Sequence, residues 1–291
     1  MSNPLPALHT FAAHLEARVR RGEQRAWMSA DARTALKEII RMKPGRMVFT
    51  APPPPPVAAP VPVPVPPPPS VAPALSRKER LAAIAARAAV APAARALGSL
   101  RDKMVFATGS PEAQIMFVGE APGADEEKQG EPFVGVAGQL LTRVIKAMGL
   151  ERGDVYITNV CKFRPVVNDE KPQGYRNRAP TGDEMMACLE FVQEEIAIIQ
   201  PRVLVALGKT AAEGLLQRDV KITSLRGQWL EYQSIPLMPT FHPSYLKRKE
   251  DEGEAVANAE KRKHWEDMLM VMERLQMQIT EKQRRFFLPK S

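Results

Sequence analysis

Five side chains that could do chemistry lie at or just beyond the ends of predicted strands. Glu120 and Glu126 belong to the segment GEAPGADE, which follows the apolar run QIMFV, and Phe133 lies a few residues further on in GEPFVG. Asn159 ends the run VYITN, and His242 directly follows LMPTF. A carboxylate can position water, a side-chain amide can read a donor–acceptor pattern, and an imidazole can stabilise a developing negative charge. The ring of Phe133 could provide a stacking surface.

Taken singly, each of these features has an ordinary structural explanation. A Gly-Glu-Ala-Pro-Gly segment forms tight turns, because glycine tolerates unusual backbone angles and proline fixes one of them. Asn159 could cap or bridge a loop, His242 could be a hydrogen-bonded histidine without a catalytic role, and Phe133 could be a core residue. The functional interpretation depends on all of these features occurring in order, each at a strand end or in the loop that follows.

The elements that must position these residues alternate between strand and helix. Short apolar runs predict buried strands, and apolar residues at helical spacing predict helices between them. The strands are expected at 114–118, 155–160, 203–207 and 237–241, and the helices at 138–148, 181–199, 210–216 and 257–277. This order predicts an α/β fold with three layers, α/β/α, around a central four-stranded parallel sheet. Ligands of such sheets bind beyond the carboxyl ends of the strands, which is where the chemical groups lie.

A proline-rich stretch divides the chain before this alternation begins. Nearly half of the 28 prolines fall within residues 49–73, and we expect this segment to be a disordered, extended linker. Residues 1–48 are expected to form a basic helical arm, 74–278 the α/β domain and 279–291 a C-terminal tail. Ser76 and Glu79 have the spacing of a capping box, which predicts a helix from there to about Val90. Thr181 and Glu184 have the same spacing at the start of the helix expected at 181–199.

Composition limits the class of protein. The chain of 291 residues has a net charge of +8, yet residues 1–105 carry an excess of ten basic residues and residues 106–291 an excess of two acidic ones. A basic arm suggests a polyanionic partner. Two cysteines are too few for a disulfide-stapled scaffold or an all-thiolate metal cage. Because no apolar run could span a membrane and no secretory signal is present, we expect a cytoplasmic protein without membrane contact.

The motifs of the α/β domain, taken together, resemble those of a known enzyme family. From about residue 105 to 275 the chain is similar to the family 4 uracil-DNA glycosylases, in the motifs GEAPGADEEKQGEPFVGVAGQLL, YITNVCKFRP, NRAPTGDEMMAC, VALGKTAAE, LRGQW and PTFHPSYLKR. The resemblance implies a DNA repair enzyme that flips uracil out of DNA and hydrolyses its N-glycosidic bond, leaving an abasic site. It implies uracil-containing DNA as the partner. We expect a monomer, whose arm could bind another protein.

The resemblance also implies roles for individual residues. Phe133 would stack on the flipped base, Asn159 would read its edge, and His242 would stabilise the negative charge that develops on uracil O2. Backbone groups at Ala121 and Gly123 would surround the base. An acidic side chain of this loop, chiefly Glu126 and otherwise Glu120, would hold the attacking water. DNA contacts are expected after the second strand and in HPSYLKR, taken as a loop in the minor groove, from Lys162, Arg164, Ser244, Tyr245, Leu246, Lys247 and Arg248.

The chain departs from this family at its cysteines. Family members hold a [4Fe–4S] cluster with four cysteines, and only Cys188 has a counterpart here. Phe163 stands at the third ligand position, Cys161 lies two residues earlier and should point differently, and no cysteine occurs near 92–95, where the upstream pair would fall. Because such a cluster needs about four thiolates, we expect no metal and no cofactor. An apolar plug of Phe163, Leu97 and Cys188 could fill the space.

The sequence is compatible with three functions. The first is a uracil-DNA glycosylase, and the second is a weak or inactive DNA-binding relative, which the missing cysteines favour. The third is a glycosylase for another deaminated base, such as hypoxanthine or xanthine. A branch of the superfamily traps DNA covalently through a histidine in an insertion. The corresponding loop at 165–178 has no histidine, and Asn177 lies near that place, so covalent trapping is disfavoured.

Overall fold

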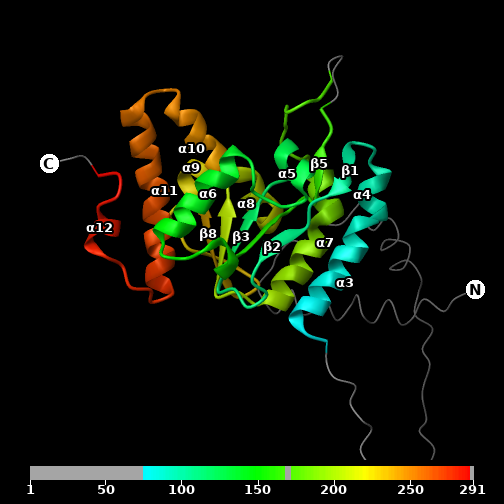
Figure 1. Ribbon diagram of the computed structural model, residues 1–291, viewed down its shortest axis with the longest axis horizontal. Helices are drawn as coiled ribbons and strands as arrows, with labels where there is room; N and C mark the ends of the chain where they lie inside the picture. Colours follow the sequence, from blue (N-terminus) through cyan, green and yellow to red (C-terminus); the bar gives the residue numbers. More distant parts are fainter. Residues whose placement is uncertain (1–74, 168–171, 289–291) are drawn as a thin grey trace, which may run out of the picture. The chain divides into compact units, whose positions relative to one another are not determined.

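The computed structural model of the protein describes residues 75–167 and 172–288 (Figure 1). The predictions for the arm at 1–48 and the linker at 49–73 lie outside the described residues. The expected α/β domain is present within the described part of the chain. No helix in that part is long and apolar enough to cross a membrane.

The main sheet of the described residues has six strands in the order β2-β4-β3-β6-β8-β7. Its four central strands are parallel, as predicted: β4 (Tyr156–Asn159), β3 (Ile115–Gly119), β6 (Val203–Leu207) and β8 (Ile235–Thr240). Two antiparallel edge strands, β2 (Ala107–Gly109) and β7 (Leu230–Tyr232), extend this sheet beyond the prediction. Three residues are too few to show the alternation of polar and apolar side chains from which a strand is predicted.

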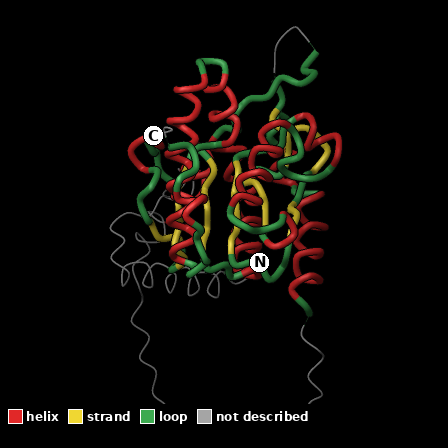
Figure 2. Tube along the Cα trace, turned by 60° about the vertical axis from the view of Figure 1, so that its left-hand side comes forward, coloured by secondary structure: helices red, strands yellow, loops and turns green. Residues whose placement is uncertain are grey.

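Helices cover both faces of the sheet, as Figures 1 and 2 show from two directions. One face carries α3 (Arg77–Ala89), α7 (Gly182–Ile199) and α8 (Lys209–Leu216), and the other carries α6 (Val136–Ala147) and α11 (Glu254–Arg274). Each central strand packs against the helices on both faces of the sheet, because successive side chains point to opposite faces. In β3, Met116 and Val118 join the first core cluster, whereas Ile115 and Phe117 join the second. The predicted three-layer α/β/α architecture is confirmed.

Two helices begin at the capping boxes predicted from sequence. The Ser76 hydroxyl accepts a hydrogen bond from the Glu79 backbone N–H, and the Glu79 carboxylate accepts one from the Ser76 N–H, at the start of α3. Thr181 and Glu184 make the same reciprocal pair at the start of α7. Side chains of this kind satisfy backbone N–H groups that have no partner within the first turn, so they fix where each helix starts.

The structure corrects two predicted segments. HPSYLKR is not a loop, because α10 (Pro243–Glu250) begins in it, with His242 as the N-cap and proline in the first turn. Residues 279–288 are not a detached tail. They include α12 (Glu281–Arg284) and pack on the domain, where the Trp265 indole N–H donates to the Gln283 carbonyl at 2.7 Å and the rings of Trp265 and Phe286 lie 5.3 Å apart.

Short elements complete the described chain. A separate two-stranded sheet pairs β1 (Leu100–Met104) with β5 (Phe163–Pro165). The remaining elements are α4 (Pro92–Ala96), α5 (Ala124–Gln129), the 3-10 helix η1 (Arg152–Asp154) and α9 (Ile222–Leu225).

Candidate active site

A cavity of about 360 Å³ lies at the carboxyl ends of β3, β4 and β8, at the edge of the sheet where the sequence analysis expects a ligand. The loop after β3, the end of β4 and the start of α10 all contribute to its walls. The lining residues are Glu120, Ala121, Pro122, Gly123, Glu126, Phe133, Ala137, Asn159, Asn177, Arg178, Ala179, His242, Ser244 and Arg248. The structure thus brings together every predicted catalytic and base-binding residue.

An aromatic ring and an amide meet at the inner wall of the cavity. Phe133 is buried, and its ring centroid lies 5.8 Å from that of His242. A Cβ atom added to Gly119, at the end of β3, would lie 2.3 Å from Asn159 Oδ1 and 2.4 Å from the Phe133 ring. Both distances are far below van der Waals contact, so only glycine at position 119 lets the ring and the amide approach each other.

Asn159 carries an unsatisfied acceptor. The residue is 2% exposed, and its Oδ1 atom has no hydrogen-bond partner among the described residues. A buried polar atom without a partner costs about 1–3 kcal/mol, so such atoms occur rarely in folded proteins without a reason. Here the atom lies beside a cavity and a stacking ring. A planar ligand with an N–H group on its edge would satisfy it.

His242 is held as a neutral donor. Its Nδ1 atom accepts from the Ser244 backbone N–H at 3.1 Å, as the cap of α10, and the Ser244 hydroxyl lies 2.7 Å away. Because a backbone N–H can only donate, Nδ1 is the acceptor, and the neutral ring carries its proton on Nε2. Burial lowers the pKa of His242 below its ordinary value against the opposing effect of Glu120. The ring therefore offers an uncharged N–H donor at neutral pH.

Gly208, at the start of α8, fixes the other side of this histidine. Its backbone is in the left-handed region at φ +91°, and an added Cβ would lie 2.8 Å from the Cβ of His242. Most residues disfavour that φ, and any side chain would also collide with His242. The two positions therefore constrain each other.

The two candidate carboxylates differ in how they are engaged. Glu126 accepts hydrogen bonds from the backbone N–H groups of Gly123, Val134 and Gly135, at 3.1, 3.0 and 2.9 Å. It therefore ties the loop after β3 to the segment that carries Phe133. Glu120 also lines the cavity, and although its backbone carbonyl accepts from the Cys161 N–H at 2.9 Å, its carboxylate makes no hydrogen bond to any described residue. Of the two, Glu120 is the carboxylate that has its oxygens available for water.

The structure contradicts two of the expected DNA contacts. The side chain of Lys162 is completely buried, and its Nζ atom lies 2.6 Å from the Glu195 carboxylate and 2.5 Å from Thr158 Oγ1. Arg164 is 4% exposed and bound to Glu127. Each cation is held by an acid inside the domain, so neither side chain can reach a phosphate.

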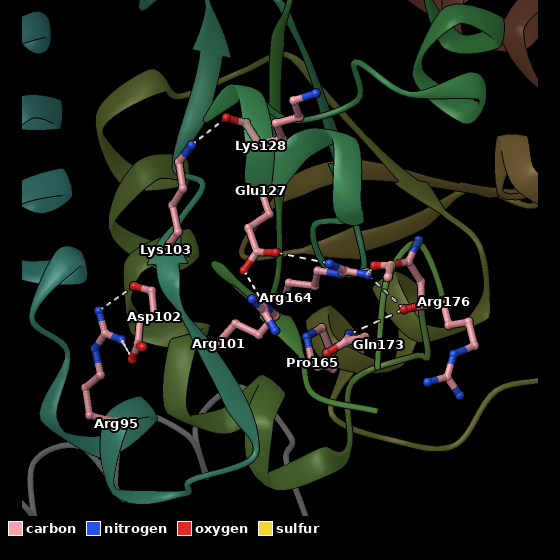
Figure 3. Close-up of polar contacts among 12 residues, drawn as sticks. Arg95, Arg101, Asp102, Lys103, Glu127, Lys128, Arg164, Pro165, Gln173 and Arg176 are labelled. Carbon is pink, nitrogen blue, oxygen red and sulfur yellow. Dashed lines mark hydrogen bonds and ion pairs between the residues drawn. The ribbon is translucent and has the colours of Figure 1, made fainter. Parts of the chain in front are cut away.

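Arg164 instead organises a loop beside the cavity. Its guanidinium donates to the Asn177 side-chain oxygen at 2.9 Å, to the Arg176 carbonyl at 2.9 Å and to Glu127 at 3.0 Å, and Figure 3 shows it between Glu127 and this loop. Because Asn177 Oδ1 accepts from Arg164, its Nδ2 donors face the other way. Sequence reasoning missed Asn177 and Arg178 as cavity residues. Two signals were available: both residues lie just before Pro180 in a motif of the family, and Asn177 lies near the place where a branch of the superfamily has its DNA-trapping histidine.

In α10 the predicted DNA contacts have different environments. Leu246 is buried against Leu140 and Phe241, so it cannot enter a groove of DNA. The Tyr245 hydroxyl donates to Glu260 at 3.2 Å. Lys247 and Arg248 are exposed, and Arg248 lies at the rim of the cavity, 3.4 Å from the Ser244 hydroxyl. Of this helix, Arg248 is therefore the best placed to bind a phosphate near the cavity.

The region where the family holds its iron–sulfur cluster contains other side chains. Phe163 and Cys188 are fully buried, and the Arg95 guanidinium lies 4.9 Å from the Phe163 ring centroid. Leu97 is 37% exposed, so the expectation that it completes an apolar plug is wrong. Cys161 is also buried, with its sulfur 3.9 Å from that of Cys188. With two thiols and no described group of three or more metal-binding side chains, these residues do not fit a [4Fe–4S] cluster.

The class of this protein follows from its three-layer α/β/α fold and from the cavity that Phe133, Asn159 and His242 line at the ends of the parallel strands. A model of the uracil-DNA glycosylase superfamily matches residues 106–269, and the chain belongs to that superfamily. It is 45% identical over 152 residues to a type-4 uracil-DNA glycosylase of Thermotoga maritima, covering 51% of this chain and 73% of the relative. The corresponding enzyme of Sulfurisphaera tokodaii is 41% identical over 157 residues, covering 51% and 67%. That of Pyrobaculum aerophilum is 38% identical over 161 residues, covering 53% and 78%.

Proposed function

We propose that this protein is a DNA repair glycosylase that excises uracil and leaves an abasic site. The observation that carries the proposal is the buried Oδ1 atom of Asn159, which has no partner in the described part of the chain, lies beside the ring of Phe133 and shares a cavity with His242. Uracil has an N3–H group that can donate to this oxygen and an O4 atom that can accept from the amide N–H. Cytosine presents the reverse pattern on the same atoms, so one fixed amide can distinguish the two bases.

The chemistry follows from the neutral His242. As the bond between N1 and C1′ breaks, its electron pair goes to the uracil ring, and negative charge accumulates on O2. The Nε2–H of His242 donates to O2, so this charge is stabilised mainly in the transition state. Phe133 stacks on the base after the nucleotide leaves the helix. The uracil anion departs and the sugar is left as an oxocarbenium ion.

Water completes the reaction at C1′. Glu120 holds the water by accepting a hydrogen bond from it and takes its proton when the oxygen bonds to C1′. Glu126 braces the loop that carries this water and the segment that carries Phe133. The proton that Glu120 has taken passes through solvent to the uracil anion, which restores the carboxylate. The products are free uracil and an abasic deoxyribose, with no covalent bond to the enzyme.

We also propose that the enzyme works without an iron–sulfur cluster, in the cytoplasm and as a monomer. The two buried thiols support a reducing location, and the side chains around Phe163 support the lack of a cluster. Uracil-containing DNA is the substrate. A protein partner for the arm is a further proposal, supported only by the helical spacing of its apolar residues.

A uracil-release assay tests the proposed activity. Single-turnover reactions with uracil in single- and double-stranded oligonucleotides should release the base, and matched cytosine substrates should stay intact. His242→Ala should lower the rate by roughly two to three orders of magnitude, because one preorganised donor is lost, while DNA affinity changes little. DNA binding without base release would favour the inactive relative. Release of hypoxanthine or xanthine but not uracil would favour the other deaminated bases.

A further inference from the structure

A second cavity lies between α6, α10, α11 and the C-terminal segment, and its lining shares no residue with the active site. Its volume is about 380 Å³. The walls are mainly apolar and aromatic, and charged side chains occur at the edge, where Lys261 pairs with Glu250 at 2.7 Å. The lining residues are Leu140, Arg143, Val144, Ala147, Leu246, Glu250, Lys261, His264, Trp265, Phe286 and Phe287.

His264 is the polar group of the inner wall. The residue is 2% exposed, and its Nε2 atom has no partner among the described residues. The other ring nitrogen, Nδ1, lies 2.9 Å from Thr240 Oγ1 on β8. His264 is a lining residue of the cavity, and Nε2 lies on the ring edge away from the contact with the sheet.

The hydrogen bonds behind His264 determine which nitrogen carries the proton. Arg226 donates to the Asp267 carboxylate with two nitrogens, and the Thr240 hydroxyl donates to the same carboxylate at 2.6 Å. Burial raises the pKa of Asp267 only to about 6, so it is a carboxylate at pH 7. Thr240 has one hydrogen and gives it to Asp267, so its oxygen must accept from His264 Nδ1–H.

The Nε2 atom of His264 is therefore a bare acceptor. Burial, with the nearby Arg226, lowers the pKa of His264 to about 4, so the ring stays neutral at pH 7 and has only the proton on Nδ1. An acceptor buried in an apolar wall loses its hydrogen bond to water and gains none from the protein. A ligand with one donor would restore that bond, and the aromatic walls favour a flat, apolar body.

We propose that this cavity binds a small aromatic molecule that carries a single hydrogen-bond donor, an indole or a phenol, with its N–H or O–H directed at His264 Nε2. The ring would pack against Trp265 and Phe286 from one side and Leu246 of α10 from the other. Because His242 caps the same helix, the ligand would contact an element that also carries an active-site residue.

Two probes that differ by one methyl group on the donor nitrogen test this site. Indole and 1-methylindole can be titrated into the full-length protein labelled with ¹⁵N-histidine. Indole should bind and shift the Nε2 resonance of His264, and 1-methylindole should bind roughly tenfold or more weakly, because it leaves the acceptor unpaired. Equal affinity for the two probes, or no binding of indole at millimolar concentration, would overturn the proposal.

Two variants locate the binding. His264→Asn keeps an N–H near the position of Nδ1 for Thr240 but removes Nε2, so the preference for indole should disappear. Ala147→Phe fills the cavity from α6 without touching His264, so both probes should lose affinity. If His264→Asn does not fold, the affinities of the two probes for the wild type and for Ala147→Phe still test the proposal. Indole that binds Ala147→Phe as it binds the wild type would place the site elsewhere and reject the proposal.

Discussion

At the scale of single residues, the selectivity of the proposed reaction depends on the amide of Asn159. Its buried oxygen can accept and its nitrogen can donate, which matches uracil on two adjacent atoms. Asn159→Asp keeps the shape of the side chain but removes the donor to O4. We expect uracil excision to slow by roughly tenfold to a hundredfold and discrimination against cytosine to weaken.

The measurement is single-turnover excision from matched duplexes containing uracil or cytosine. Gln139→Glu is a suitable control, because it makes the same amide-to-carboxyl change on an exposed position of α6. An Asn159→Asp enzyme with wild-type rate and selectivity would mean that another group reads the base.

Residue type together with position at a strand end predicted the cavity residues better than the DNA contacts. Asn159, Phe133 and His242 were found because amides, rings and imidazoles at strand ends share one edge of the sheet. The DNA contacts predicted for Lys162 and Arg164 were wrong, because a positive charge in the sequence does not reveal whether an acidic side chain will hold it inside the fold. Glu195, the partner of Lys162, comes from a helix 33 positions later in the chain, and nothing in the local pattern links the two.

At the scale of elements, the start of α7 couples stability to pH. The Glu184 carboxylate closes the capping box with Thr181 and accepts from Arg178 at 2.7 Å and from Ser99 at 2.6 Å. Burial would raise its pKa, but these hydrogen bonds outweigh that effect and lower the pKa to about 2. Because the folded pKa lies below the unfolded value, this stabilisation is complete above about pH 4.5 and is lost as the pH falls toward 2.

Glu184→Gln should therefore lower the thermal midpoint at pH 7, and the gap from the wild type should narrow below about pH 4.5. Thermal unfolding of both proteins over a pH series measures this. Glu190→Gln, on the exposed side of the same helix, should change little at any pH. A gap for Glu184→Gln that stays constant down to pH 3 would contradict the assigned pKa.

Helices and strands were predictable from the sequence where a local pattern of residues indicates them. Apolar runs gave the four parallel strands, and the capping boxes at Ser76 and Thr181 gave two helix starts. The helix after His242 was missed, because histidine is a rare cap and HPSYLKR lacks apolar spacing. The C-terminal packing of Phe286 was missed for a different reason, since its partner Trp265 lies on another helix and the contact is tertiary.

The surroundings of β5 lead to a prediction about metal content. Phe163 fills the third ligand position, Arg95 covers its ring, and two thiols cannot replace four. The purified protein should therefore be colourless and contain far less than one iron per chain. Metal analysis and the visible absorption spectrum test this. About four irons per chain would show that the ligands come from residues other than those assigned.

At the scale of the whole molecule, charge is divided between two parts of the chain. Residues 106–291 have a slight acidic excess, whereas residues 1–105 are strongly basic. Binding to duplex DNA requires Lys and Arg to displace counterions. We expect the N-terminal residues to hold the domain near DNA, so a chain that begins at Ala74 should bind non-specific DNA more weakly and with a shallower dependence on salt.

The excision rate of the shortened chain at saturating enzyme should equal that of the full chain, because the cavity lies entirely within the domain. Binding isotherms at several salt concentrations, together with single-turnover rates, separate the two effects. Identical affinities and salt slopes would instead favour the alternative in which the arm docks another protein.

The close approach of Gly208 to His242 has an evolutionary consequence. Gly208 does not line the active-site cavity, yet a substitution there would displace the histidine that does. Natural selection should therefore remove substitutions of Gly208 as strictly as it removes substitutions of His242. Among distant sequences, joint retention of the glycine and the histidine should mark chains that have kept the reaction, whereas loss of the glycine alone should identify lineages in which selection for it has ended.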